Sequence, residues 1–293
     1  MFTQYFGNYL FESNVISLEQ FREALQQMKD KRAKLGVLAI QSGYMTPDQV
    51  EETFALQKQM DKKFGEIAAQ KGYLTDSQLE GLLEKQSSPF SVFSQVMIES
   101  GAMTYATLSE HLENYKKKCG MSEESFAKFQ DGDVTPVVEK LLLGFAGDPS
   151  KDLVIIRTYV EVFLKNIMRF ISDNVTVDES RQPESEEWFS CQHMTGAQSV
   201  ISSFSGSEEA MLYIAGKFAE TKFTEVDALA RDVLGEFLNC NNGIFTANAL
   251  ENGLDLDLEP QFVTKDKKEA VTDHMFRVPF SVDDYEYQLT LAF

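Results

Sequence analysis

The sequence predicts an α+β protein, in which an all-α domain of helical hairpins precedes a domain with an antiparallel sheet and helices. Three features of the 293-residue chain lead to this prediction. Residues recur at a spacing of 29 through roughly the first 117 positions. Amphipathic helical patterns follow in the second half. The tail then alternates between apolar and polar residues, as expected for strands with one buried face.

The composition is that of a globular, strongly acidic protein. Apolar residues make up 43% and charged residues 25%, and 46 acidic against 27 basic side chains give a formal net charge of −19. Such a polyanion repels nucleic acid and anionic membranes unless it carries a basic stripe, and the longest basic run is 116–118. We therefore expect no nucleic-acid partner. The sequence also has no apolar run of about 18 residues, so we expect no membrane insertion.

Cysteine and histidine usage predicts a cytoplasmic protein without a metal. The three cysteines are odd in number and far apart, which is typical of reduced thiols rather than a disulfide framework. CxxC and HExxH are missing, and the histidines stand apart from one another. Glycine-rich nucleotide cradles and GxSxG are missing as well. We expect no cofactor in this chain.

The 29-residue unit predicts pairs of helices over residues 1–117. One glycine position lies inside the first helix of each unit, and a second follows that helix as its C′ residue. A Ser or Thr then caps the second helix, with Gln three residues later in most copies as in a capping box. The positions concerned are Gly7, Gly36 and Gly65; Asn14, Gly43, Gly72 and Gly101; and Ser17, Thr46, Thr75 and Thr104.

Two of these units resemble the N-terminal domain of type II secretion and type IV pilus ATPases, the GspE and MshE N-terminal group. The resembling strings are AKLGVLAIQSGYMTPDQVEETFALQ and KKFGEIAAQKGYLTDSQLEGLLEKQ. Some members of that group bind cyclic di-GMP through copies beginning Arg-Leu-Gly. Here Lys34 and Lys63 replace the arginine, and lysine cannot make its planar, bidentate contact. The repeat is therefore either a scaffold for a protein partner or oligomer, or a cyclic di-GMP site at Lys34 and Lys63.

Residues 118–150 are expected to form a linker or a short helix, and 151–293 the second domain. Helical spacing of apolar residues predicts a helix over 152–171, and two strands are expected at 188–191 and 199–205. Further helices are predicted to begin at Ser207 and at a Thr224 cap, with another over 244–253. The tail predicts two strands that share a turn at 283–284.

One helix of this second domain carries a polar face that could form a catalytic or binding site. Asp232, Glu236 and Asn239 are spaced i, i+4 and i+7, which places them on one side of a helix. Leu229, Val233 and Phe237 are expected to point into the core, and Pro260 follows after the next helix. By spacing alone, such polar residues are also common on a solvated helix face, so this pattern leaves both interpretations open.

The pattern resembles the active site of the CheC, CheX and FliY phosphatases of bacterial chemotaxis. Their motif is Asp or Ser, then Glu, Asn and a later Pro, which here are Asp232, Glu236, Asn239 and Pro260. The resemblance covers about 150–293 and, with one copy of the motif, is nearest to CheX. It implies a homodimer, and a phosphorylated CheY-like receiver domain as substrate. It implies Glu236 and Asn239 as catalytic residues, with Asp232 and Pro260 in support.

The implied chemistry is hydrolysis of an aspartyl phosphate. The receiver supplies its own Mg²⁺ and lysine, so the phosphatase needs mainly to position a water in line with phosphorus. Asn239 would hold that water, and Glu236 would pair with the receiver lysine. Orientation is expected to matter more than base catalysis, because an ordinary carboxylate is a weak base at neutral pH. The alternative is a CheX-like adaptor that docks without turnover and uses the N-terminal repeats as its binding part.

Overall fold

The computed structural model describes residues 1–28, 31–60, 62–143, 152–177, 183–196, 198–266 and 275–293. The chain forms two compact units, Phe2–Asp133 and Val134–Phe293, and Met1 groups with the second. The boundary between the units falls within 118–150, the stretch predicted to be a linker or a short helix. This stretch contains two helices, α9 (Glu123–Gln130) in the first unit and α10 (Thr135–Leu143) in the second, while 144–151 lie outside the described residues.

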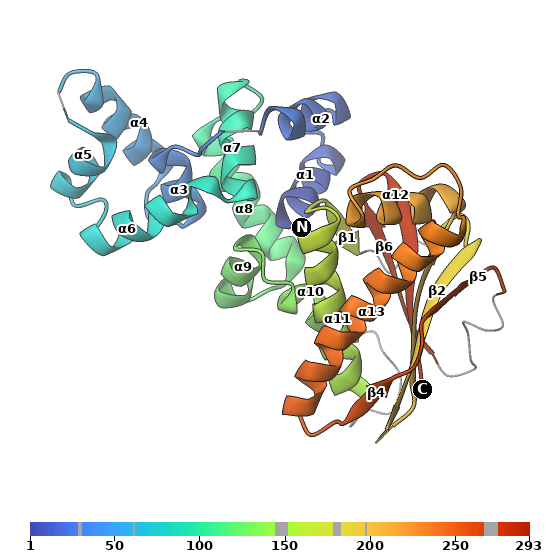
Figure 1. Ribbon diagram of the computed structural model, residues 1–293. Helices are drawn as coiled ribbons and strands as arrows, with labels where there is room; N and C mark the ends of the chain where they lie inside the picture. Colours follow the sequence, from blue (N-terminus) through green and yellow to red (C-terminus); the bar gives the residue numbers. More distant parts are fainter. Residues whose placement is uncertain (29–30, 61, 144–151, 178–182, 197, 267–274) are drawn as a thin grey trace. The chain divides into compact units, whose positions relative to one another are not determined.

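The first unit is all α, as predicted (Figure 1). Short helices follow one another with tight connections, and one 3-10 turn, η1 (Lys85–Ser87), interrupts them. The helices are α1 (Phe2–Glu12), α2 (Leu18–Gln27), α3 (Leu35–Gln41), α4 (Pro47–Gln57), α5 (Phe64–Gln70), α6 (Asp76–Glu84), α7 (Pro89–Glu99), α8 (Tyr105–Cys119) and α9.

The residues that recur at 29-residue spacing adopt the same local conformations. The second residue after the end of α1, α3, α5 and α7 has a left-handed backbone, with φ of 55° at Asn14, 66° at Gly43, 72° at Gly72 and 76° at Gly101. This conformation suits glycine and, among other residues, asparagine. Each second helix begins with a reciprocal capping box, formed at Ser17, Thr46, Thr75 and Thr104.

The other recurring glycines allow the two helices of a hairpin to approach closely. A Cβ atom at Gly36 would lie 2.8 Å from Val50 Cγ1 on α4, and one at Gly65 would lie 2.8 Å from Leu79 Cδ1 on α6. Gly7 meets the ring of Phe21 in the same way. These positions therefore require glycine for packing, whereas the C′ glycines require it for backbone geometry.

The second unit is an antiparallel sheet with helices, which confirms the predicted α+β class. The helices are α10, α11 (Asp152–Phe170), α12 (Glu208–Phe218) and α13 (Ala228–Glu251). The strands are β1 (Val175–Val177), β2 (Trp188–Gly196), β3 (Val200–Gly206), β4 (Leu256–Leu258), β5 (Phe262–Thr264), β6 (Met275–Val282) and β7 (Tyr285–Ala292). Within the described residues they form one sheet in the order β1-β6-β7-β3-β2-β4, and β5 also pairs with β2.

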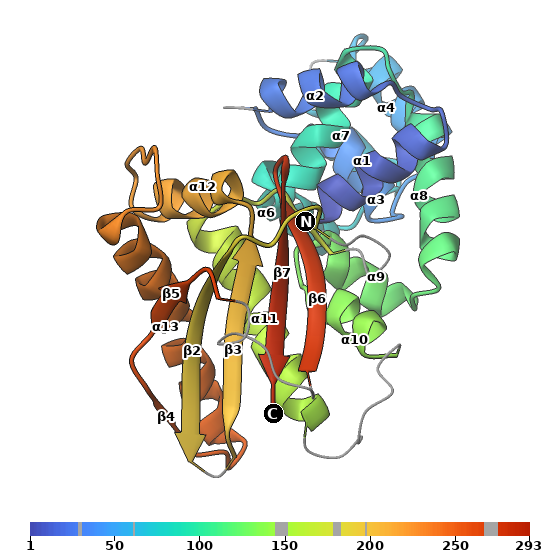
Figure 2. The same ribbon diagram turned by 90° about the vertical axis from the view of Figure 1, so that its right-hand side faces the viewer.

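Helices α11, α12 and α13 pack against one face of this sheet (Figures 1 and 2). An aromatic cluster joins the two layers, because Phe163 of α11 contacts Phe204 of β3, Phe237 of α13 and Phe280 of β6 at ring-centroid distances of 5.3–6.1 Å. All four rings are buried. Burial of such side chains contributes about 1.5–3 kcal/mol each, so the cluster holds α11 and α13 firmly on the sheet.

Helix α13 differs from the prediction in three respects. Its N-cap is Asp227, whose side chain accepts from the backbone N–H of Ala230 at 2.8 Å, rather than Thr224. It continues without a break to Glu251, so the separate helix predicted over 244–253 is wrong. Leu229, expected in the core, lies in the first turn of the helix and is 60% exposed.

Candidate functional site

The polar motif lies along one side of α13. Asp232 and Glu236 are exposed and Asn239 is half-buried. Glu236 and Asn239 are one turn apart, and Asn239 Nδ2 lies 3.5 Å from Glu236 Oε2. The structure thus brings the two predicted catalytic side chains together, where a protein partner can reach them. The helix itself is held in place by its opposite side, where Leu234, Phe237 and Leu238 are buried.

Pro260 lies in the segment between β4 and β5, which runs past the same part of α13. The carbonyl of Glu259, just before it, accepts from Gln192 Nε2 at 2.8 Å, and the same nitrogen donates to Asn239. Gln261, just after it, packs so closely on α13 that a Cβ at Gly235 would lie 2.8 Å from Gln261 Cγ. The fold therefore places Pro260 beside the motif, although the two are far apart in sequence.

Behind Asn239 lies a network of buried polar side chains that the sequence motif does not include. Gln192 of β2 donates to Asn239 Oδ1 at 2.8 Å and accepts from Asn242 Nδ2 at 2.8 Å. Asn242 also donates to Ser202 Oγ at 2.8 Å and accepts from Tyr159 Oη at 2.6 Å. Buried polar groups are costly unless paired, and these four are paired with one another.

A signal for this network is present in the sequence. Ser190 and Gln192 occupy positions of β2 that face the helices, where an apolar residue is expected, and Asn241-Asn242 follow the motif on α13. Polar residues at core positions of both a strand and a helix indicate a buried polar contact. Which strand lies against which helix, however, depends on the sheet order, which the sequence does not provide.

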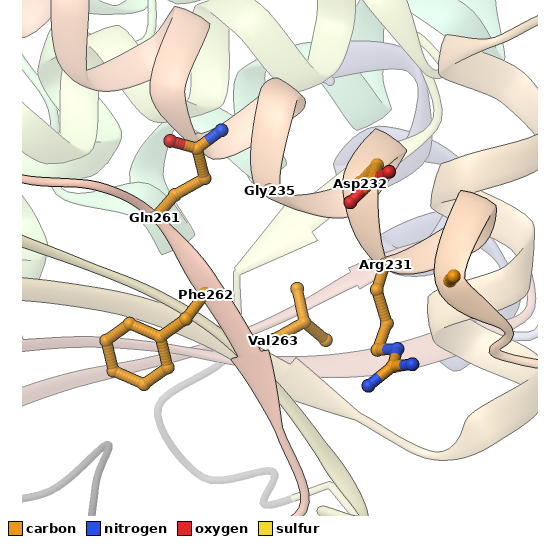
Figure 3. Close-up of a pocket in the computed structure, with 7 residues that line it drawn as sticks. Arg231, Asp232, Gly235, Gln261, Phe262 and Val263 are labelled. Carbon is orange, nitrogen blue, oxygen red and sulfur yellow. The ribbon is translucent and has the colours of Figure 1, made fainter.

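A small hollow adjoins the motif on its N-terminal side. It has a volume of about 230 Å³ and lies between the start of α13 and β5 (Figure 3). Asp232 and Arg231 line it from the helix, Val263 lines it from β5, and Gln261 lines it from the segment just before β5. Asp232 therefore stands at the edge of the motif, next to a concavity, rather than between Glu236 and Asn239.

The side chains of the site and of the network behind it carry carboxylate, amide and hydroxyl groups. No group of three or more His, Cys, Asp or Glu side chains within the described ranges is arranged to hold a metal ion. Burial raises the pKa of the Tyr159 hydroxyl above its ordinary value, so this group stays protonated and keeps a proton to donate within the network. No helix in the described part of the chain is both long and apolar enough to span a membrane.

The two lysines proposed for ligand binding occupy equivalent places in the first unit. Lys34 and Lys63 are the N-cap residues of α3 and α5, and both are exposed. The Lys34 ammonium pairs with Glu99 Oε1 of α7 at 3.0 Å. That ammonium is the main reason why the pKa of Glu99 lies below its ordinary value. A dinucleotide at Lys34 would have to compete with this ion pair.

No protein-family model matches the sequence, and a search of characterised proteins finds no match. Solved structures do resemble part of it. The chemotaxis protein CheX from Vibrio vulnificus matches with a TM-score of 0.42 and 16% identity, over 47% of this chain and 98% of that one. The CheX–CheY–BeF3–Mg²⁺ complex from Borrelia burgdorferi gives 0.42 and 15%, over 47% and 96%. A CheC-like superfamily protein from Shewanella sp. PV-4 gives 0.39 and 17%, over 47% and 96%.

At these identities and TM-scores the likenesses assign no activity to this chain. They cover about half of it. The resemblance of the first unit to the GspE and MshE N-terminal group has no counterpart among these structures and stays a prediction.

Proposed function

We propose that this chain is a protein phosphatase that hydrolyses the aspartyl phosphate of a CheY-like receiver domain. The observation that carries the proposal is the pairing of Glu236 and Asn239 on α13, with their polar atoms 3.5 Å apart at the surface. The spacing of this pair matches the motif of the CheC, CheX and FliY phosphatases, which the sequence resembles. Because the substrate is a whole receiver domain, the catalytic side chains must lie on an exposed surface, as these two do on α13.

In the proposed reaction Asn239 holds a water molecule in line with the phosphorus atom. The water oxygen forms a bond to phosphorus while the bond between phosphorus and the aspartyl oxygen breaks. The receiver aspartate leaves as a carboxylate, and both water protons end on the phosphate released. The Mg²⁺ of the receiver would neutralise charge on the phosphoryl group, and this chain contributes orientation of the water.

Glu236 is assigned to binding rather than to proton transfer. It would pair with the receiver lysine and so fix the register of α13 against the phosphorylation site. Asp232 and Pro260 are assigned supporting positions, Asp232 at the edge of the docking face and Pro260 in the segment that borders it. Loss of Asn239 should be severe, because one orienting group contributes roughly 100-fold or more to such a step.

The test is the rate at which a phosphorylated CheY-like receiver loses its phosphate. Asn239→Ala and Glu236→Ala should abolish the acceleration given by the unmodified protein. Asn248→Ala and Glu251→Ala are matched controls, because both residues are exposed near the end of the same helix, and they should retain full activity. Equal activity of Asn239→Ala and Asn248→Ala would refute the assignment. Measurable binding without acceleration would favour the adaptor function instead.

The remaining functional expectations stand as predictions from the resemblance. A homodimer and a cytoplasmic location belong to the proposed phosphatase. The helical unit is assigned to localisation or signal sensing, through a protein partner or through cyclic di-GMP at Lys34 and Lys63. Titration of the protein with the dinucleotide, and of a Lys34→Ala/Lys63→Ala variant, tests the last of these.

A further inference from the structure

The amide of Asn239 is held by a chain of hydrogen bonds that reaches into the core. Gln192 Nε2 donates both to Asn239 Oδ1 and to the Glu259 carbonyl, each at 2.8 Å. Gln192 Oε1 accepts from Asn242 Nδ2 at 2.8 Å. Gln192 and Asn242 have exposures of 1% and 0%, so water does not compete for these bonds.

The backbone carbonyl of Glu259 fixes the direction of every bond in this chain. A carbonyl can only accept, so the end of Gln192 that faces it must be the NH2 group. The second N–H of that group points at Asn239, which must therefore present its oxygen. Gln192 Oε1 then faces Asn242, whose NH2 group also donates to Ser202 Oγ at 2.8 Å. A flipped Gln192 would set oxygen against oxygen on two sides.

The consequence for the site concerns which end of the Asn239 amide faces outward. Because Oδ1 accepts from Gln192, Nδ2 lies on the side of Glu236, 3.5 Å from Oε2. An amide nitrogen carries two hydrogens, so a further N–H stays available for a partner. The outer end of Asn239 is a hydrogen-bond donor, not an acceptor.

We propose that Gln192 is a positioning residue that makes Asn239 present an N–H donor to the phosphorylated receiver. The inference rests on the proposed phosphatase function and adds the group that organises it. The donated hydrogen bond goes to an oxygen, either of the attacking water or of the phosphoryl group. A water that accepts one hydrogen bond from Asn239 keeps its other lone pair for attack on phosphorus.

Gln192→Met and Ser190→Ala are the matched variants for this test. Methionine has nearly the shape of glutamine and no amide, so it removes the hydrogen bonds to Asn239, Asn242 and the Glu259 carbonyl and leaves the volume filled. Ser190 lies two residues earlier on β2, is equally buried, and donates to the Leu234 carbonyl of α13 at 3.1 Å. Both variants remove hydrogen bonds between β2 and α13, one in Ser190→Ala and two in Gln192→Met, but only Gln192→Met frees Asn239.

The turnover number and the affinity for the receiver should respond differently. In Gln192→Met we expect the turnover number to fall by about 10- to 100-fold, as on loss of a partner that orients an active group. The dissociation constant for a receiver activated with beryllium fluoride should change less than about twofold, because Glu236 is unaltered. Ser190→Ala should leave both quantities unchanged. A Gln192→Met enzyme with normal turnover, beside an active unmodified enzyme, would overturn the positioning role.

Two further measurements separate this inference from the proposed function. Asn239→Asp keeps an oxygen for Gln192 but turns the outer donor into a carboxylate oxygen, and it should be as inactive as Asn239→Ala. Retained activity would refute the outward donor. Independently of activity, nuclear Overhauser contacts from the Asn239 amide protons to the Glu236 side chain should be present in the unmodified chain and in Ser190→Ala, and lost in Gln192→Met. Their absence from the unmodified chain would refute the orientation, whereas their presence with no phosphatase activity would refute only the function.

Discussion

Replacing Gly243 by alanine should stabilise α13 but hinder access of the receiver to the site. It lies in the interior of the helix, one turn beyond Asn239, and is exposed. A Cβ atom added there would meet no atom within 4 Å, so packing within the chain does not require glycine. Glycine in a helix interior costs about 0.8–1.0 kcal/mol relative to alanine. Gly243→Ala should therefore stabilise the second unit by about 1 kcal/mol and raise its thermal midpoint by about 2–4 °C.

The same methyl group should impair the reaction with the receiver. If the receiver packs against α13 around Asn239, a new methyl on that surface costs about 1 kcal/mol or more, which is about fivefold or more in KM. Calorimetry and phosphatase kinetics on the same sample check both parts. Gly253→Ala is the control, because a φ of 79° makes alanine unfavourable there and should lower the midpoint. A Gly243→Ala protein that is more stable and fully active would refute the docking of the receiver at this surface.

Three predictions concern the first unit. Thr46→Ala removes the capping box of α4 and should destabilise the unit by about 1 kcal/mol, measured by urea unfolding. Gly65→Ala should be destabilising as well, because its Cβ would lie 2.8 Å from the facing leucine of α6, and amide hydrogen exchange should show α5 and α6 opening more easily. Lys71 and Tyr73 hold the pKa of Glu52 below its ordinary value, so the ionised carboxylate stabilises the fold at neutral pH and this contribution is lost as pH falls through that lowered pKa. The difference in urea midpoint between Glu52→Gln and the unmodified protein should therefore shrink toward acid, and a constant difference would contradict the linkage.

The sequence was sufficient wherever a local rule determines the structure. The positive φ at Gly43 and Gly72 and the capping boxes at Thr46 and Thr75 depend on a few neighbouring residues, so residue identity and spacing predict them. The same holds for the face shared by Glu236 and Asn239, which follows from helical periodicity alone.

The sequence was insufficient where the outcome depends on competing partners or on sheet order. Thr224 and Asp227 are both good N-caps, and the helix begins after Asp227. Gly243 resembles a helix end, yet the helix continues because residues on both sides of it, such as Asn242 and Phe245, have partners in the core. The contact between Gln192 and Asn239 requires β2 to lie under α13, which only the assembled sheet provides.

Asn239 lies between the surface and the core, a position that suits the orienting role we propose for it. A fully exposed asparagine samples both orientations of its amide, so a partner would have to select one and lose binding free energy in doing so. A fully buried one cannot reach a protein substrate. Asn239 is half-buried, with Oδ1 bound to Gln192 on the inner side and Nδ2 beside Glu236 on the outer side. In the proposed reaction the buried amides would fix the orientation of Asn239, and the exposed Glu236 would recognise the partner.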